Sequence, residues 1–381
     1  MDFALTEEHS MLRTVARDFL EANCPKKLVR AMIEDDRGYT TDLWEGMAEL
    51  GWMGLSIPEE YGGAGANLLD LAILIEEMGR ACLPGPFFST VVLGGLSLLQ
   101  SGSKELKRSF LPKMVQGKLL LTLALTETSG VYSPDTIKTE AIADRQGGFI
   151  IRGTKLFVAD AHVADYIICV ARTDRKANSE ERINMFLVKR DSPAVRCCLL
   201  KTISGDKQCE VVLDDVKVPE GGILDGIDNG WYRTQQVLEK ATAVKCAEML
   251  GGARQVLEMT VSYAKERTAF GHPIGTFQAV QHALADMFID IEACALVTYD
   301  AIWRLSCEIP ASHETSIAKA LISEAFKKAT LSSHQIHGAV GFTADHDLTL
   351  YSKRAKASEL ALGDAHFHLD KIAIQSGIMT V

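Results

Sequence analysis

The sequence predicts an α+β protein with an N-terminal helical domain, a middle antiparallel β-barrel domain and a C-terminal four-helix bundle. The length of 381 residues is enough for two or three domains. Hydrophobic residues recur with the helical period towards both ends of the chain, whereas the middle consists of short β-branched runs with a period close to two. We therefore expect domains at residues 1–117, 118–225 and 226–381.

Two amphipathic stretches with capping residues predict helices in the first domain. Thr6 can cap a helix whose first turn carries two glutamates that the helix dipole favours, and Pro25 ends that helix. Asn67 precedes a second stretch of the same kind. The apolar side of the first helix is expected to consist of Leu12, Val15, Ala16, Phe19 and Leu20.

Short runs in the middle and long runs at the C-terminus predict the other two domains. The middle runs are FIIRGTKLFV, DYIICVAR, INMFLVK and EVVLDDVKV, whose spacing is typical of an antiparallel barrel or sandwich. The C-terminal runs have the helical period, and glycine or proline interrupts the chain between them, which is typical of a bundle. These four runs are Trp231–Glu266, Phe277–Glu308, Ser312–Gly338 and Asp347–Gly377.

Composition excludes several classes of protein. A hydrophobic fraction of 47% and a charged fraction of 24% are typical of a globular chain. The net charge is −10 and no cations cluster, which argues against a nucleic-acid partner. The longest apolar runs, such as Val91–Leu99, are too short for a membrane span, and the N-terminus lacks the features of a signal peptide. Nine cysteines without a CxxC pair predict a reduced, cytoplasmic protein.

Motifs for several familiar sites are absent from the sequence. It contains no GxGxxG after a strand, no P-loop and no GxSxG. Two histidine pairs, His334 with His337 and His366 with His368, lack the additional ligands that a tetrahedral metal site needs. We therefore expect no metal.

Three segments are candidates for ligand binding, and each has a simpler explanation. Arg267 lies beside a Gly/Pro turn and Gln278 opens the next helix, so their donors could bind a phosphate. An ordinary helix–loop–helix with an exposed arginine explains that pattern equally well. The turn at Gly338 permits close approach to a ligand, or is a plain helix C-cap. Thr126 follows an apolar strand, where it could bind a flat heterocycle or merely end the strand.

The chain resembles the acyl-CoA dehydrogenase family along all three parts. The resemblance is carried by FALTEEH, LGWMGLSIPEEYGGAG, ALTE, KERTAFGHPIGTFQAVQH and HQIHGAVGFT. It implies a helical domain, a β domain and a four-helix bundle, in a tetramer that holds FAD between the β domain and the bundle. It also implies an acyl-CoA substrate that is oxidised to a 2-enoyl-CoA, and an electron-transfer flavoprotein as electron acceptor.

The resemblance also assigns residues to the flavin. The positions that match contacts with the pyrophosphate and adenosine are Arg267, Phe270 and Gln278. A turn donated by the neighbouring subunit matches Gln335, Ile336, Gly338 and Ala339. A strand end against the isoalloxazine ring matches Leu123, Leu125 and Thr126. Phe157 stands where the family often has a Trp against the flavin, and Ala159 replaces a common Thr that hydrogen-bonds the ring.

The catalytic base is missing from both positions where the resemblance implies a Glu. The reaction needs a base that removes the α proton while the β hydrogen leaves as hydride to the flavin. Leu362 matches the position in a loop after the third bundle helix, and Ala241 matches the alternative in the first bundle helix. Asp364 and Glu239 are the nearest candidate carboxylates, although half a helical turn directs Glu239 to another face.

Several interpretations of this departure are open. The chain is a dehydrogenase whose base has moved, or a subunit of a heteromer whose homologous partner supplies the carboxylate, or a protein that performs non-oxidative chemistry on a CoA thioester. A base-less subunit that only helps to bind FAD is a further alternative. The C-terminal part resembles the branch with heteromeric steroid- and ring-degrading enzymes, so a heterotetramer stands beside the homotetramer. Thr242 replaces an arginine that often binds the CoA phosphates, and this second loss favours the heteromer.

Overall fold

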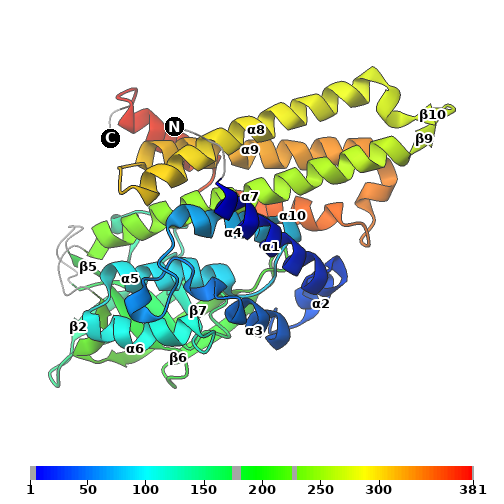
Figure 1. The fold of residues 1–381 in the computed structure, drawn as a ribbon. Helices are drawn as coiled ribbons and strands as arrows, with labels where there is room; N and C mark the ends of the chain where they lie inside the picture. The colour runs from blue at the N-terminus through cyan, green and yellow to red at the C-terminus, as the bar shows by residue number, and fades with distance from the viewer. Residues whose placement is uncertain (1–5, 174–181, 225–229, 380–381) are drawn as a thin grey trace. The chain divides into compact units, whose positions relative to one another are not determined.

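The chain forms two compact units, each built from segments that are distant in the sequence. A computed structural model describes residues 6–173, 182–224 and 230–379 (Figure 1). Unit 1 comprises Met1–Arg30, Asn67–Leu83 and Thr242–Val381, and unit 2 comprises Ala31–Ala66 and Pro84–Ala241. The N-terminal helices are therefore divided between the units, and the predicted boundary at 225–226 lies outside the described residues.

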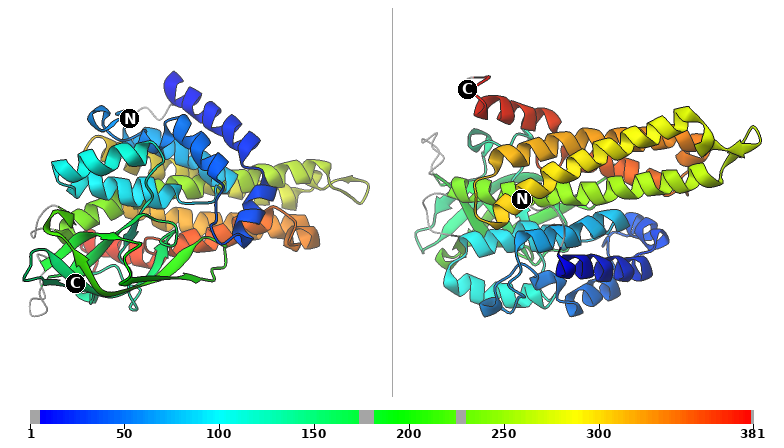
Figure 2. Two further views of the ribbon diagram at one scale, coloured as in Figure 1. Left: turned by 90° about the horizontal axis from the view of Figure 1, so that it is seen from below. Right: turned by 45° about the horizontal axis from the view of Figure 1, so that its top comes forward.

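Helices make up almost all of unit 1. They are α1 (Glu7–Asn23), the start of α2 (Lys26–Glu34), α4 (Leu68–Ala81), most of α7 (Gly230–Glu266), α8 (Gln278–Ser306), α9 (Ser312–His337), α10 (Leu348–Leu360) and α11 (Ala365–Gln375), with the short turns η7 (Ile274–Thr276) and η8 (Gly338–Phe342). A small hairpin of β9 (Thr268–Ala269) and β10 (His272–Pro273) joins α7 to α8. Figure 2 shows α8 and α9 running along each other, and α9 also packs against α10 and α11.

Both predicted caps in the N-terminal part are confirmed. The side chain of Thr6 accepts a hydrogen bond from the N–H of His9 at 3.2 Å, and α1 begins at the next residue. The side chain of Asn67 accepts one from the N–H of Leu69 at 2.7 Å, and α4 follows directly. These starts are predictable because a capping side chain satisfies N–H groups only two or three residues away.

Two adjacent buried glutamates of α4 connect the helices of unit 1. Glu77 accepts hydrogen bonds of 2.8 and 2.9 Å from the guanidinium of Arg17 on α1. Glu76 accepts one of 2.7 Å from Arg254 on α7 and another from the hydroxyl of Tyr299 on α8. The buried carboxylates are thus paired with cations or hydroxyl donors, as burial requires.

Helices α4 and α7 touch through their backbones. A Cβ atom on Gly79 would lie 1.9 Å from the carbonyl oxygen of Glu248, and one on Gly251 would lie 1.8 Å from that of Glu76. Any larger residue at either glycine would push the two helices apart. This approach brings Glu76 and Glu77 within reach of several helices at once.

The last predicted helix, Asp347–Gly377, is wrong as a single element. The structure has two helices there, α10 and α11, separated by Ala361–Asp364. Leu362 and Gly363 in this loop have φ angles of 60° and 96°. Left-handed residues cannot continue a right-handed helix, so the chain turns and starts again.

Unit 2 contains an open sheet covered by helices. The strands are β1 (Leu121–Ala124), β2 (Glu140–Ala143), β3 (Phe149–Ala159), β4 (Tyr166–Arg172), β5 (Ile183–Lys189), β6 (Val195–Leu200), β7 (Gln208–Val218) and β8 (Ile223–Leu224). The helices are α3 (Thr41–Glu49), the π-helix η3 (Phe88–Gly95), α5 (Leu96–Ser101), α6 (Lys104–Val115), the end of α2 and the start of α7 up to Ala241. Short 3₁₀ turns lie at η1 (Trp52–Gly54), η2 (Glu59–Tyr61), η4 (Pro134–Thr136) and η6 (Glu220–Gly222).

The predicted antiparallel β-barrel is wrong in closure and in direction. The strand order is β6-β7-β3-β2-β4-β5-β8, and within the described residues the end strands β6 and β8 do not pair with each other. A barrel needs that final pairing. In addition, β1 runs parallel to β4, and β2 also pairs with β4 in parallel through one residue pair, so the sheet is mixed. The middle domain is therefore an open mixed sheet.

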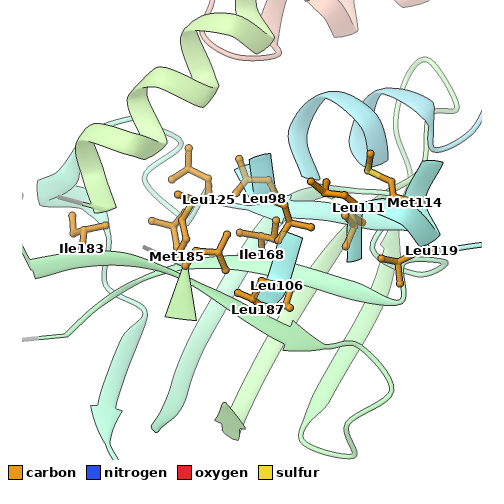
Figure 3. Close-up of a cluster of buried hydrophobic side chains, with 14 of the residues drawn as sticks. Leu98, Leu106, Leu111, Met114, Leu119, Leu125, Ile168, Ile183, Met185 and Leu187 are labelled. Atoms are coloured by element: carbon orange, nitrogen blue, oxygen red, sulfur yellow. The ribbon is translucent and has the colours of Figure 1, made fainter. Parts of the chain in front are cut away.

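A cluster of buried side chains in unit 2 joins helices to this sheet (Figure 3). Helices α5 and α6 contribute Leu98, Leu106, Leu111 and Met114. Strands β4 and β5 contribute Ile168, Ile183, Met185 and Leu187. Because these strands are covered, β5 is buried at every residue but the last, and its apolar residues do not alternate with polar ones.

Helix length and hydropathy do not indicate a membrane protein in the part of the chain that the structure describes. There, no helix is both long enough and apolar enough to cross a bilayer.

Candidate functional site

Strand β1 and the residues that follow it lie beside the second half of β3 in unit 2. The carbonyl of Thr126 accepts a hydrogen bond of 2.9 Å from the N–H of Leu156, and the hydroxyl of Thr122 donates one of 2.6 Å to the carbonyl of Ala159. Phe157 lies between these contacts. The structure thus brings together the residues expected at the flavin ring in this unit, which are Leu123, Leu125, Thr126 and Phe157.

This strand end offers an apolar surface with few polar groups. Phe157 has a φ of 55° and its side chain is 57% exposed, at an irregularity in the pairing of β3 with β7. The side chains of Leu123 and Leu125 are buried in the core. A ligand here would meet the Phe157 ring, the half-buried Thr126 and main-chain atoms, which suits a flat heterocycle.

A buried ion pair supports the strand end. Lys155 donates to the carboxylate of Glu127 at 2.7 Å and to the carbonyl of Leu125 at 3.1 Å. Glu127 also accepts from the N–H groups of Lys138 at 2.8 Å and Thr139 at 3.0 Å. Burial alone would raise the pKa of Glu127, but the ammonium of Lys155 and the other donors hold it below its usual value.

Sequence reasoning missed this ion pair, because its partners are far apart along the chain. One signal was available. Ile151 and Lys155 are four residues apart in one strand and therefore lie on the same face. A lysine on the same face as buried Ile151 requires a buried partner.

The second group of expected residues lies at the hairpin between α7 and α8 in unit 1 (Figure 1). The N–H of Arg267 donates to the carbonyl of Tyr263 at 2.8 Å, and its own carbonyl accepts from Ile274 at 2.8 Å. Phe270 forms the tip of the hairpin with a φ of 54° and is 93% exposed. Gln278, the first residue of α8, is exposed as well. An exposed guanidinium near a helix N-terminus suits a phosphate.

The turn after α9 lies at the same end of unit 1 as Arg267. The ring of His337 stacks on that of Tyr263, with centroids 4.3 Å apart, and Tyr263 donates to the carbonyl of His337 at 3.4 Å. Burial lowers the pKa of His337. The helix ends at Gly338, whose φ is 63°. The predicted residues of this turn are the exposed Gln335, Gly338 and Ala339 and the half-buried Ile336.

The candidate carboxylates have different surroundings. Asp364 accepts a hydrogen bond of 2.8 Å from the N–H of Phe367 and is the N-cap of α11. Glu239 lies half-buried on α7 in unit 2. Leu362 is half-buried in the α10–α11 loop of unit 1, whereas Ala241 is fully buried on α7 in unit 2. The side chain of Asp364 therefore has a structural role that a free base would not have.

No metal centre is apparent. Across residues 6–173, 182–224 and 230–379, no three or more His, Cys, Asp or Glu side chains gather in a way that could hold an ion.

Domain families match the chain along most of its length. Residues 6–118 match the acyl-CoA dehydrogenase N-terminal domain, residues 122–216 the middle domain, and residues 228–376 the C-terminal domain.

Individual relatives match over nearly the whole chain. The probable acyl-CoA dehydrogenase YngJ of Bacillus subtilis (strain 168) is 30% identical, and the match covers 98% of this chain and 99% of the relative. The acyl-CoA dehydrogenase IpdE2 of Mycobacterium tuberculosis is 31% identical, with 92% of each chain covered.

Solved structures match as well. A chain of the ChsE4-ChsE5 complex from Mycobacterium tuberculosis has 28% identity and a TM-score of 0.90, with 100% of both chains covered. The FAD complex of PigA has 25% identity and a TM-score of 0.92, with 99% of this chain and 100% of that chain covered.

Proposed function

The chain belongs to the acyl-CoA dehydrogenase family, and we propose that it works as one subunit of a heteromeric, FAD-dependent acyl-CoA dehydrogenase. The reaction is the α,β-dehydrogenation of an acyl-CoA thioester to the 2-enoyl-CoA. The observation that carries the heteromer is Leu362, an apolar residue where the family's base is expected. A homologous partner subunit then supplies the carboxylate. The similarity to a chain of the ChsE4-ChsE5 complex supports this proposal.

The residues of the chain fit FAD, which is the cofactor of this enzyme. When bound, FAD accepts the hydride that leaves the β carbon. Arg267 and the free N–H groups at the start of α8 supply donors for the pyrophosphate, and the exposed ring of Phe270 offers a stacking surface for the adenine. Thr126 and Phe157 hold the ring system in place. Without a Thr at Ala159, one hydrogen bond to that ring is missing.

Removal of the α proton is the step that this chain supports least. The α carbon is a weak acid, so a carboxylate must lie close to it. For Asp364 to act as that base, it would have to give up the hydrogen bond that caps α11. Glu239 belongs to unit 2 and does not stand at the matched position. Both residues stay candidates for a base that has moved within the chain.

Exposed apolar side chains on α8 and α9 support assembly into a homotetramer or heterotetramer. A monomer rarely leaves so much apolar surface in contact with water. The exposed residues are Phe288, Ile289, Leu296, Leu321 and Leu331. We also propose an electron-transfer flavoprotein as acceptor, the three-domain division at 1–117, 118–225 and 226–381, and a cytoplasmic location, which the nine free cysteines favour.

One experiment separates the proposal from its alternatives. The chain is purified alone and after co-expression with a homologous subunit encoded nearby, and the visible spectrum of each preparation is recorded. Short, branched, aromatic and steroid-side-chain acyl-CoAs are then added without oxygen. We expect the flavin to bleach only in the co-expressed preparation.

Other outcomes point to the alternatives. Bleaching by the chain alone means that the base has moved, and the variants Asp364→Asn and Glu239→Gln then identify which carboxylate is needed. Flavin that never bleaches in either preparation indicates a subunit that only helps to hold FAD. Consumption of the thioester without bleaching indicates non-oxidative chemistry. A chain that never binds flavin in any assembly contradicts the proposal.

A further inference from the structure

Lys319 of α9 is a fully buried lysine that binds the loop between α10 and α11. Its ammonium donates to the carbonyl of Gly363 at 2.8 Å, to the carbonyl of Glu359 at 2.9 Å and to the hydroxyl of Ser323 at 3.3 Å. All three acceptors are uncharged oxygen atoms. Two of them belong to Glu359 in the last turn of α10 and Gly363 in the loop, so one side chain connects both α10 and the loop to α9.

The loop has little freedom apart from these contacts. Leu362 is left-handed, and a Cβ atom on Gly363 would lie 2.3 Å from the ring of Phe367. His368 places its Nε2 atom 3.0 Å from the carbonyl of Leu362. Burial lowers the pKa of His368 to about 4, so the ring is neutral at pH 7 and its Nε2–H donates to that carbonyl. The carbonyls of Leu362 and Gly363 are therefore both held by buried donors.

Packing alone does not explain a lysine at this position. An apolar side chain of similar length would fill the core of the helical unit without the cost of desolvating an ammonium. What the ammonium adds is a fixed position for one carbonyl in the last turn of α10 and one in the loop, and hence for the Cα–Cβ bond of residue 362 between them.

We infer that Lys319 is a positioning residue, which fixes the loop Ala361–Asp364 and so sets how the acyl-CoA thioester is held. The inference rests on the proposed function, because the family places residue 362 beside the reacting carbons. Lys319 lies on another helix, α9, and is fully buried, so it acts on the substrate only through the backbone that it binds.

The test compares Lys319→Met with Lys328→Met in the FAD-loaded, co-expressed enzyme. Methionine has nearly the same length and lacks both charge and donors. Lys328 is on the same helix but exposed, and it pairs with Asp290 at 2.6 Å, so its replacement is the matched control. Amide hydrogen exchange of a peptide covering residues 358–368 reports on the loop. The change of the flavin spectrum on titration with octanoyl-CoA and the steroid-side-chain acyl-CoA reports on substrate affinity.

We expect Lys319→Met to keep its flavin, while loop exchange speeds up and acyl-CoA affinity falls, each by about tenfold or more, because hydrogen bonds from a charged donor are lost. Lys328→Met should match the wild type in all three measurements. Loop exchange and affinity within about twofold of the wild type would overturn the inference, since a tenfold effect is expected.

Further outcomes separate this inference from the proposed function. Should Lys319→Met fail to fold, Lys319→Gln, which is polar but shorter, takes its place with the same criteria. If neither folds while Lys328→Met does, the role of Lys319 is structural and the inference is wrong. If the wild type binds no acyl-CoA, the proposed function fails, and faster loop exchange in Lys319→Met would show that the loop contact itself still exists.

Discussion

Among the described residues each unit contains one fully buried lysine, and the two lysines have different surroundings. In unit 2, Lys155 faces the carboxylate of Glu127 at 2.7 Å, and the pair holds the strand end expected at the flavin ring. In unit 1, Lys319 donates its hydrogen bonds to carbonyl and hydroxyl oxygens, and burial lowers its pKa to about 8. The buried charges at the strand end therefore balance each other. Among the described residues no carboxylate forms an ion pair with Lys319, although those of Glu359 and Asp364 act on its ammonium from a greater distance, and residue 362 is a leucine.

This difference bears on the incomplete chemistry of the chain. At the strand end expected beside the flavin ring, the buried lysine is paired with a carboxylate. The loop expected beside the substrate has a fixed backbone, but the side chain at its centre is the uncharged Leu362. A loop that is held in position but carries no catalytic base is expected in a subunit whose partner supplies that base.

The largest expected effect comes from placing a carboxylate on that scaffold. Leu362→Glu should give the chain on its own the ability to bleach its flavin with an acyl-CoA, at a rate about 10²–10⁴ times the background, the usual contribution of a general base. Anaerobic stopped-flow measurement checks this. Leu360→Glu, an exposed position two residues earlier, is the control and should stay inactive. A Leu362→Glu variant that binds FAD and acyl-CoA yet never bleaches would mean that residue 362 does not face the reacting carbon.

The next effect sharpens the contrast between the two lysines. Glu127→Ala leaves the ammonium of Lys155 buried without its counter-charge and should lower the free energy of unfolding by about 3–5 kcal/mol. Ser323→Ala removes one neutral contact of Lys319 and should cost only about 0.5–1.5 kcal/mol. Urea denaturation monitored by circular dichroism measures both. Equal losses would contradict the distinction drawn between a paired and an unpaired lysine.

The burial of Lys319 should make the stability of the protein depend on pH. Its pKa is about 8 in the folded chain against the usual 10.5 of a lysine, so between these values the unfolded chain binds more protons and stability rises with pH. The difference in unfolding free energy between wild type and Lys319→Met should shift in favour of the wild type by roughly 1.5 kcal/mol from pH 8 to pH 9.5. The exposed pair of Lys328 raises the pKa of that lysine, so the difference for Lys328→Met should stay flat over this range. A flat profile for Lys319→Met would mean that its ammonium is not destabilised by burial.

The smallest effect is expected from an exposed ion pair on the same sheet as Lys155. Arg152 on β3 binds both carboxylate oxygens of Asp215 on β7, with one hydrogen bond of 2.9 Å. Water and salt screen such a pair. Asp215→Asn keeps a residue that tolerates the left-handed backbone found there, and its denaturation midpoint should equal that of the wild type. A clear loss would show that charge pairing on this sheet matters regardless of burial.

Sequence reasoning succeeded where the physics is local and failed where it depends on distant partners. The helix starts at Thr6 and Asn67 follow from contacts within one turn. Closure of the sheet depends on whether β6 meets β8, which no local pattern specifies. The hydrophobic period alone missed the break at Leu362, which only the resemblance placed in a loop, because a leucine in an apolar helical pattern gives no sign of a left-handed backbone.

The candidate site divides in the same way. Arg267, Phe270 and Thr126 were assigned by resemblance, and the structure places each at a turn or a strand end, which is where ligand contacts are made. Two supporting lysines escaped notice, Lys155 beside the strand end at Thr126 and Lys319 beneath the loop at Leu362. Lys155 and Lys319 each act on atoms 28 or more residues away, and such contacts exist only after folding.

The continuous helix α7 has a practical consequence for anyone who wishes to dissect the molecule. Its residues up to Ala241 belong to one unit and those from Thr242 to the other, and the remaining segments of the units alternate along the chain. No single scission can release either half as an intact fragment. After cleavage of one surface loop, each fragment still contains segments of both units, so the fragments should stay associated. The smallest useful expression product is therefore the whole polypeptide.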